Sequence, residues 1–212
     1  MPTIVEDPRR ISPPPPVIPG DRGPDGDSGD FGSSFPLTKG QIGTWVLLTA
    51  VIMLFAGLTS AYIVLRGVPS WQNIELPFLL WPNTAILLLS SVAVEISKRA
   101  IRRNDVQSMK RWLIIGGLLG FGFLAGQLAA WRQLVNAGVY LPSTQQSSFF
   151  YILTGLHGLH LLGGIVALGI VLVMALRNRL STFRYEPLKL AGTYWHVMDA
   201  IWIYLFLLLL LS

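Results

Sequence analysis

A long apolar run, Phe149 to Leu176, constrains what this chain can fold into more than any other feature. It contains no acidic or basic side chain apart from two histidines. A hydrocarbon core of about 30 Å needs roughly 20 helical residues, so this run is long enough to cross a bilayer with some tilt. His157 and His160 lie near its middle, and their spacing of three places them on one face of a helix. Ionisable side chains at such a depth indicate a functional role.

The rest of the chain has a similar character, since 52% of its 212 residues are hydrophobic and 13% are charged. This composition predicts a polytopic membrane protein rather than a soluble domain. The sequence has no cysteine, which excludes disulfides and cysteine-based metal or redox chemistry. Its net charge of +5 comes from basic residues clustered between apolar runs. Because that pattern is typical of membrane topology, nucleic acid is not an expected partner.

We predict an all-α fold, a helical membrane bundle with five transmembrane helices. The domain covers residues 41–212, with spans at about 42–65, 78–96, 112–131, 149–176 and 191–211. Basic residues concentrate before the first span, between the second and third, and between the fourth and fifth. The opposite side has Arg66 and Arg132 alone. The positive-inside rule therefore predicts a cytoplasmic N-terminus and an external C-terminus.

Residues 1–40 precede the first span and have a different composition. Four consecutive prolines are followed by a stretch rich in Gly, Asp and Ser, with little apolar material to bury. We expect a disordered Pro/Gly-rich cytoplasmic tail. The tail lacks the short apolar segment of a signal peptide, so we expect it to be retained.

Tryptophans and small residues predict how the helices are anchored and packed. Small residues four apart favour close approach of the first, third and fourth helices, for example at Gly57 and Ala61. Six of the seven tryptophans lie close to span ends, where interfacial anchors are expected. These are Trp45, Trp71, Trp81, Trp112, Trp131 and Trp195.

Few ionisable side chains fall within the spans. They are Glu95, His157, His160, His196 and Asp199. Glu95 lies in the last turn of the second span beside Lys98 and Arg99, and we expect it to pair with them. Asp199 would cost several kcal/mol in lipid without a partner, so it should face the bundle interior.

Four of these side chains form a candidate site. Each helical residue adds a rise of about 1.5 Å. Counted from the ends at which the two helices enter the membrane, Asp199 and His160 therefore lie at a similar depth. We therefore predict an intramembrane polar seam between the last two helices, formed by His157, His160, His196 and Asp199. Three interpretations stay open: hydrogen bonding that fixes helix register, proton handling or water organisation, and a site for zinc, iron or copper.

No other motif in the sequence carries chemistry. There is no Gly-rich phosphate loop ahead of a lysine, no nucleophile elbow, no carboxylate pair and no haem attachment motif. Any enzyme that this chain serves is expected to keep its reactive centre in another chain.

Two segments carry a family resemblance. The first runs from Phe149 through Leu153 to His160 and continues into Gly163-Gly164, and the second has Trp195-His196, Asp199 and Trp202 in order. Together they resemble the signature helix and the last helix of subunit III of the haem-copper oxidases, in its five-helix bacterial form. The resemblance extends over roughly residues 40 to 212. Matching motif residues are Gly155, Gly158, Gln127, Trp195 and Trp202.

The chain departs from the family pattern at two intramembrane positions. The family usually has a glutamate in its first helix where this chain reads Ala50-Val51, and another in its third helix where this chain has Ala130. Both acids are missing, which removes the carboxylates to which a role in the membrane interior is usually attached.

The resemblance implies a non-catalytic accessory subunit of cytochrome c oxidase, in a complex that reduces oxygen and pumps protons. It implies subunits I and II as partners, haems and copper in those partners and no cofactor or metal in this chain. It also implies a phospholipid-filled cleft for oxygen or proton access, and a multi-pass location in the bacterial cytoplasmic membrane.

Other functions stay open at this point. A quinol oxidase or a nitric oxide reductase system within the same family is compatible with the sequence, because other chains determine donor and substrate. From a different class, a small proton-coupled transporter could use the His/Asp cluster. The sequence has no inverted repeat or paired broken helices of the kind that transporters show.

Overall fold

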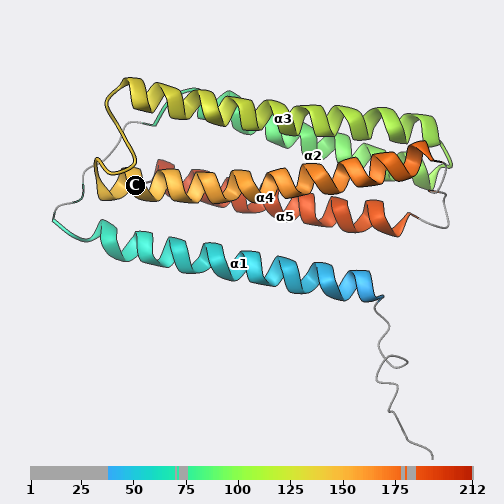
Figure 1. Cartoon of the computed structure of the whole chain (residues 1–212), viewed down its shortest axis with the longest axis horizontal. Coiled ribbons are helices and arrows are strands. Elements are labelled where there is room, and N and C mark those ends of the chain that lie inside the picture. The colour runs from blue at the N-terminus through green and yellow to red at the C-terminus, as the bar shows by residue number, and fades with distance from the viewer. Residues whose placement is uncertain (1–37, 70, 72–75, 178–179, 181–184, 212) are drawn as a thin grey trace, which may run out of the picture. The chain divides into compact units, whose positions relative to one another are not determined.

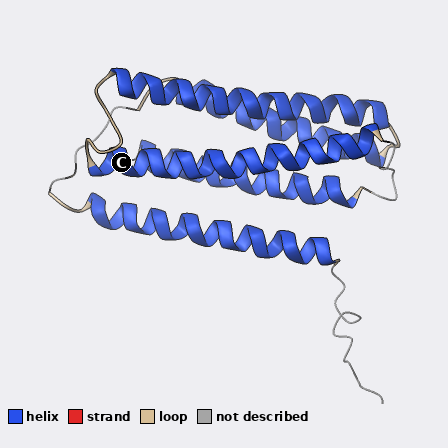
Figure 2. Ribbon diagram, in the orientation of Figure 1, coloured by secondary structure: helices blue, strands red, loops and turns tan. Residues whose placement is uncertain are grey.

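The computed structural model describes residues 38–69, 71, 76–177, 180 and 185–211. All the regular structure among them is α-helical (Figure 2). Five helices follow one another along the chain (Figure 1). They are α1 (Lys39–Arg66), α2 (Leu80–Arg102), α3 (Val106–Asn136), α4 (Gln145–Leu176) and α5 (Glu186–Leu210). The predicted all-α helical bundle is confirmed. Most of the predicted tail lies outside the described residues, and α1 begins inside its last positions, at Lys39.

Polar side chains fix where three of the helices begin. Thr38 and Gln41 form a capping box at the start of α1, and Thr144 and Ser147 form another at the start of α4. Asp105 caps α3 by accepting a hydrogen bond from a backbone N–H of its first turn. These caps satisfy N–H groups that have no partner within the helix. Helix starts therefore depend on polar residues that lie outside the apolar runs.

The helices α3, α4 and α5 extend beyond the predicted spans. The helix α3 begins at Val106 rather than at position 112, and α5 begins at Glu186 rather than at position 191. The predicted limits followed apolar residues alone, whereas a helix continues through its polar ends until its backbone is capped. Four of the described helices, α1, α3, α4 and α5, are long and apolar enough to cross a membrane. The helix α2, which was also predicted as a span, is not among these four, and it packs against both α3 and α5.

The helices α2 to α5 form the body of the bundle, and α1 lies along one edge (Figure 1). Within the described helices, α1 contacts α4 and α5 alone. Its two ends are tied to α5. Gln41 Nε2 donates to Glu186 Oε2 at 3.2 Å, and Arg66 donates to the Leu211 carbonyl at 2.7 Å. These polar contacts hold α1 where its apolar contacts are few.

Glycines of α3 bring helices together, whereas those of α1 do not. A Cβ added at Gly116 would contact Val94 of α2 at 3.0 Å, so the two backbones approach closely there. Gly57 of α1 has no such neighbour within 4 Å in this chain, and Ala61 is exposed. The predicted close packing through small residues is therefore right for α3 and wrong for α1.

Trp195 lies in the core and is not an interfacial anchor. Its side chain is fully buried. The indole packs against Gly120 of α3 and Gly164 of α4, where an added Cβ would meet it at 2.6 and 3.2 Å. The sequence places Trp195 near a predicted span end, but α5 begins earlier than that span, and this places Trp195 well inside the helix.

Candidate functional site

The two histidines of α4 have different surroundings. His157 is completely buried among aromatic rings, with ring centroids 4.9 Å from Trp202, 5.9 Å from Phe123 and 6.5 Å from Phe55. Neither of its nitrogens has a hydrogen-bond partner in the described structure. His160 Nδ1 lies 2.8 Å from the Leu156 carbonyl oxygen of its own helix. Among the described residues, no side chain of another helix forms a hydrogen bond with either imidazole.

His196 of α5 turns toward α2 instead. Its Nδ1 lies 2.7 Å from the Ser91 hydroxyl. Its Nε2 lies 3.2 Å from Lys98 Nζ and 3.4 Å from Glu95 Oε2. The imidazole thus bridges a hydroxyl and a charged pair, all on one face of α2. We refer to Ser91, Glu95, Lys98 and His196, which these contacts join, as the α2–α5 network.

Asp199 lies one turn further along α5. Its side chain is 4% exposed, and neither carboxyl oxygen completes a hydrogen bond among the described residues.

The four predicted residues therefore do not form one seam between the last two helices. In the described structure, no hydrogen bond or ion pair joins His157 or His160 to His196 or Asp199. The helices α4 and α5 meet through other groups: the Tyr194 hydroxyl donates to the His160 carbonyl at 3.0 Å, and Trp202 packs on His157. Periodicity places His196 and Asp199 on one face of α5, but it does not say which helix covers that face.

A shared metal site of three histidines and a carboxylate is not formed either. Within the part of the chain that the structure describes, no three His, Asp or Glu side chains gather closely enough to hold a metal ion. The suggested donors lie in separate surroundings. His157 is among aromatic rings, His160 contacts a carbonyl of its own helix, and His196 contacts α2.

The predicted pairing of Glu95 is confirmed. Its carboxylate contacts Lys98, and the second oxygen lies 3.6 Å from Arg99 Nε. The contact with His196 was missed, as was the role of Ser91. A signal for both was present in the sequence, since Ser91, Glu95 and Lys98 are spaced by four and three residues and share one face of a helix.

The family motif residues lie in the helix contacts. Gly155 and Gly158 of α4 face Trp131 and Leu124 of α3, where an added Cβ would meet them at 3.4 and 3.6 Å. The Trp202 indole N–H of α5 donates to the Thr84 hydroxyl of α2 at 3.0 Å.

The remaining motif residue, Gln127, and the positions of the two missing acids are all buried. The Gln127 side chain is buried, and its amide has no hydrogen-bond partner in the described structure. Asn83 of α2 is in the same situation and lies against Gly126 of α3. Val51 and Ala130, at the positions of the missing acids, are buried as ordinary apolar side chains.

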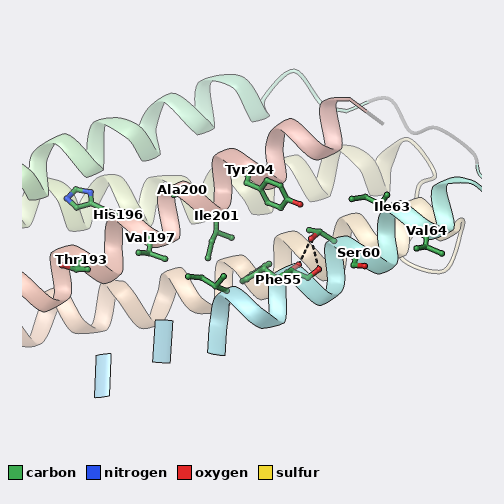
Figure 3. Close-up of a pocket in the computed structure, with 13 residues that line it drawn as sticks. Phe55, Ser60, Ile63, Val64, Thr193, His196, Val197, Ala200, Ile201 and Tyr204 are labelled. Atoms are coloured by element: carbon green, nitrogen blue, oxygen red, sulfur yellow. Dashed lines mark hydrogen bonds between the residues drawn. The ribbon is translucent and has the colours of Figure 1, made fainter. Parts of the chain in front are cut away.

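A groove lies between α1 and α5 (Figure 3). Its volume is about 850 Å³, and most of its lining is apolar, with Phe55 and Ile63 from α1 and Ile201 from α5. Thr59 also lines the groove, and its hydroxyl donates hydrogen bonds to carbonyl oxygens of its own helix, α1. Figure 3 shows His196 toward one end of the groove. The groove therefore connects an apolar surface to one member of the α2–α5 network.

Long apolar helices that bury polar side chains such as His157 and Asp199 define a multi-pass helical membrane protein. Residues 41–211 match the family of cytochrome c oxidase subunit III, and the chain belongs to that family. It is 34% identical to the probable cytochrome c oxidase subunit 3 of Nocardia farcinica, over 78% of this chain and 84% of that protein.

Two further relatives agree with this membership. The cytochrome c oxidase subunit 3 of Corynebacterium diphtheriae is 34% identical, over 79% of this chain and 85% of that protein. The cytochrome c oxidase subunit 3 of Synechocystis is 36% identical, over 81% of this chain and 75% of that protein. The resemblance found in the sequence is confirmed.

Proposed function

We propose that this chain is the non-catalytic accessory subunit III of a bacterial cytochrome c oxidase. The complex would pass electrons to oxygen and pump protons across the cytoplasmic membrane, while this chain stabilises subunit I. The observation that carries the proposal is the family match over residues 41–211, which covers almost all of the helical bundle. The bacterial sources of the named relatives support the bacterial membrane as its location.

The distribution of donor side chains supports a reactive centre in partner subunits. A haem or a copper ion needs ligands that converge on one point. His157 lies among aromatic rings, and His196 is held by Ser91 and Lys98 on another helix, so these histidines do not converge. We propose that subunits I and II bind the haems and copper of the complex.

The groove between α1 and α5 supports a lipid-binding role. It opens along two helices, it has about 850 Å³ of space, and its lining includes Ile52, Ile63 and Val197. An acyl chain would find mostly apolar contacts there, and oxygen partitions into such an environment. We propose that a phospholipid occupies this groove and leaves a route for oxygen toward subunit I.

The test is purification from the native membrane in mild detergent through an affinity tag on this chain. A reduced-minus-oxidised optical spectrum and mass spectrometry of the co-purifying chains are then recorded. We expect haem absorbance and a large partner that contains the haem and copper ligands. The haem types and the remaining partners would identify the electron donor.

A second multi-pass protein of the same membrane, with the same tag, controls for chains that co-purify non-specifically. A stable complex with neither haem nor such a partner would overturn the oxidase assignment.

A further inference from the structure

The helix α1 is hydrogen-bonded to α5 at both ends, and a groove separates the two helices in between. In the first turn of each helix, Gln41 donates from Nε2 to Glu186 Oε2 at 3.2 Å. At the other end, Arg66 donates to the Leu211 carbonyl oxygen at 2.7 Å. We call these two hydrogen bonds the start tie and the end tie. The groove of about 850 Å³ lies between them (Figure 3).

The attachment of α1 to α4 is of a different kind. Phe55 is 2% exposed, and its ring centroid lies 5.8 Å from that of His160 and 6.5 Å from that of His157. Tyr62 is completely buried, and its ring centroid lies 5.7 Å from that of Phe149. All three pairs meet edge to face, which is a favourable arrangement of aromatic rings. Separating α1 from α4 would therefore break a close-packed contact.

The two ties to α5 are exposed hydrogen bonds. Such a bond competes with bonds to water, so its net contribution is small and it can open and close. At the start tie, each partner keeps another polar contact when the tie opens. Gln41 Oε1 accepts from the Thr38 backbone N–H at 3.1 Å, and Lys189 Nζ lies 3.9 Å from Glu186 Oε1. The ties are therefore easier to open than the aromatic contacts with α4.

We propose that α1 is a lid of the groove, packed on α4 through Phe55 and Tyr62 and latched to α5 by the two ties. When a tie opens, that end of α1 moves away from α5 while the aromatic rings stay packed on α4, and the groove widens. When both ties are closed, α1 stays beside α5 and the groove keeps its described width.

The lid gives the groove a way to exchange what it binds. An acyl chain would be retained while both ties are closed and released when one of them opens. This consequence rests on the lipid-binding role proposed above, because it needs an occupant. The lid itself depends on contacts within this chain alone.

The experiment tests the end tie, because an apolar contact of Leu190 with Gly40 accompanies the start tie. The intact complex, purified through this chain, carries spin labels at Ala61→Cys of α1 and Leu207→Cys of α5. Both positions are exposed and lie outside the groove lining. Pulsed electron double resonance then measures the distance between the two labels. The chain has no cysteine of its own, and labelled complex without the two substitutions identifies signals from partner subunits.

With Arg66 in place, we expect one dominant distance, that of the closed lid. In Arg66→Leu, the population at longer distances should grow about three- to tenfold relative to the closed one, because the loss of one hydrogen bond shifts a two-state equilibrium by about that factor. Arg66→Lys retains a donor for the Leu211 carbonyl and should restore most of the closed population.

Arg132→Leu is the matched control. Arg132 is an exposed arginine in the last turns of α3, and it forms no hydrogen bond or ion pair with another helix in the described structure. This substitution should leave the distance distribution unchanged.

If Arg66→Leu does not assemble, Glu186→Leu opens the start tie instead. It is measured with labels at Leu47→Cys of α1 and Val92→Cys of α2, which are also exposed. We expect the same growth of longer distances there.

An unchanged distance distribution in Arg66→Leu, or in Glu186→Leu where that variant replaces it, would overturn the lid. The same change in Arg132→Leu would overturn it as well. Lack of haem in the same sample would overturn the oxidase assignment alone.

Discussion

Gly120 of α3 leaves the space that the Trp195 indole of α5 fills. A Cβ at this position would come within 2.6 Å of Trp195 Cη2, closer than real Cβ atoms approach. A Cβ added at Gly164 of α4 would also meet this ring, at 3.2 Å. Glycines on two helices thus leave the space that one aromatic side chain from a third helix fills.

Replacing Gly120 by alanine should therefore destabilise the bundle. Overpacking of a close-packed core typically costs about 1–3 kcal/mol. We expect a lower midpoint in thermal unfolding of the purified complex, followed by tryptophan fluorescence.

Gly117→Ala is the matched control for this substitution. No atom lies within 4 Å of the added Cβ there, and alanine is favoured over glycine inside a helix by up to about 1 kcal/mol. Equal midpoints for the two variants would contradict the role of Gly120.

Among the elements, α1 differs from the other four helices. It contacts α4 and α5 at the edge of the bundle, and many of its large apolar side chains are exposed, such as Trp45, Met53 and Val64. The face it turns toward α5 encloses a groove rather than a close-packed contact (Figure 3). Such a surface suits contact with lipid, because van der Waals packing between helices is incomplete there.

Filling the groove should displace its lipid. Ala56→Trp places an indole in the groove lining, and we expect about one phospholipid fewer per chain, since a cavity of this size holds about one ligand molecule. Quantitative lipid mass spectrometry of the purified complex measures the change.

Ala61→Trp places the same side chain at an exposed position of α1 that does not line the groove. It should retain the wild-type lipid content. The same lipid loss in both variants would show that the effect of Ala56→Trp does not depend on the groove.

At the scale of the whole molecule, the asymmetric placement of basic residues predicts the orientation in the membrane. Lys98, Arg99, Arg102, Lys110 and Arg111 lie around the connection between α2 and α3. The connection between α3 and α4 has Arg132 near it as its basic residue. The positive-inside rule places the first connection in the cytoplasm and the second outside.

The absence of cysteine in the sequence makes this topology directly testable. Gln107→Cys and Gln145→Cys are a matched pair, since both glutamines are exposed in the first turn of a helix. In intact cells a membrane-impermeant maleimide should label position 145 and leave position 107 unlabelled. In permeabilised cells it should label both. Labelling of position 107 in intact cells would reverse the predicted orientation.

The sequence by itself determined the membrane class, the all-helical fold and the family. These follow from composition, from the length of apolar runs and from motifs such as that around His157 and His160, all of which are local in the chain. Local signals also predicted the contacts of Glu95 with Lys98 and Arg99, because residues three and four apart on a helix are neighbours.

Tertiary structure alone decided which helix faces met. Periodicity grouped His196 with Asp199, but the rotation of α5 in the bundle turned that face toward Ser91 of α2 rather than toward the histidines of α4. The same rotation placed Trp195 in the core between two glycines. Helix rotation is set by packing across the whole bundle, and apolar residues on nearly every side of a membrane helix give a sequence pattern little power to specify it.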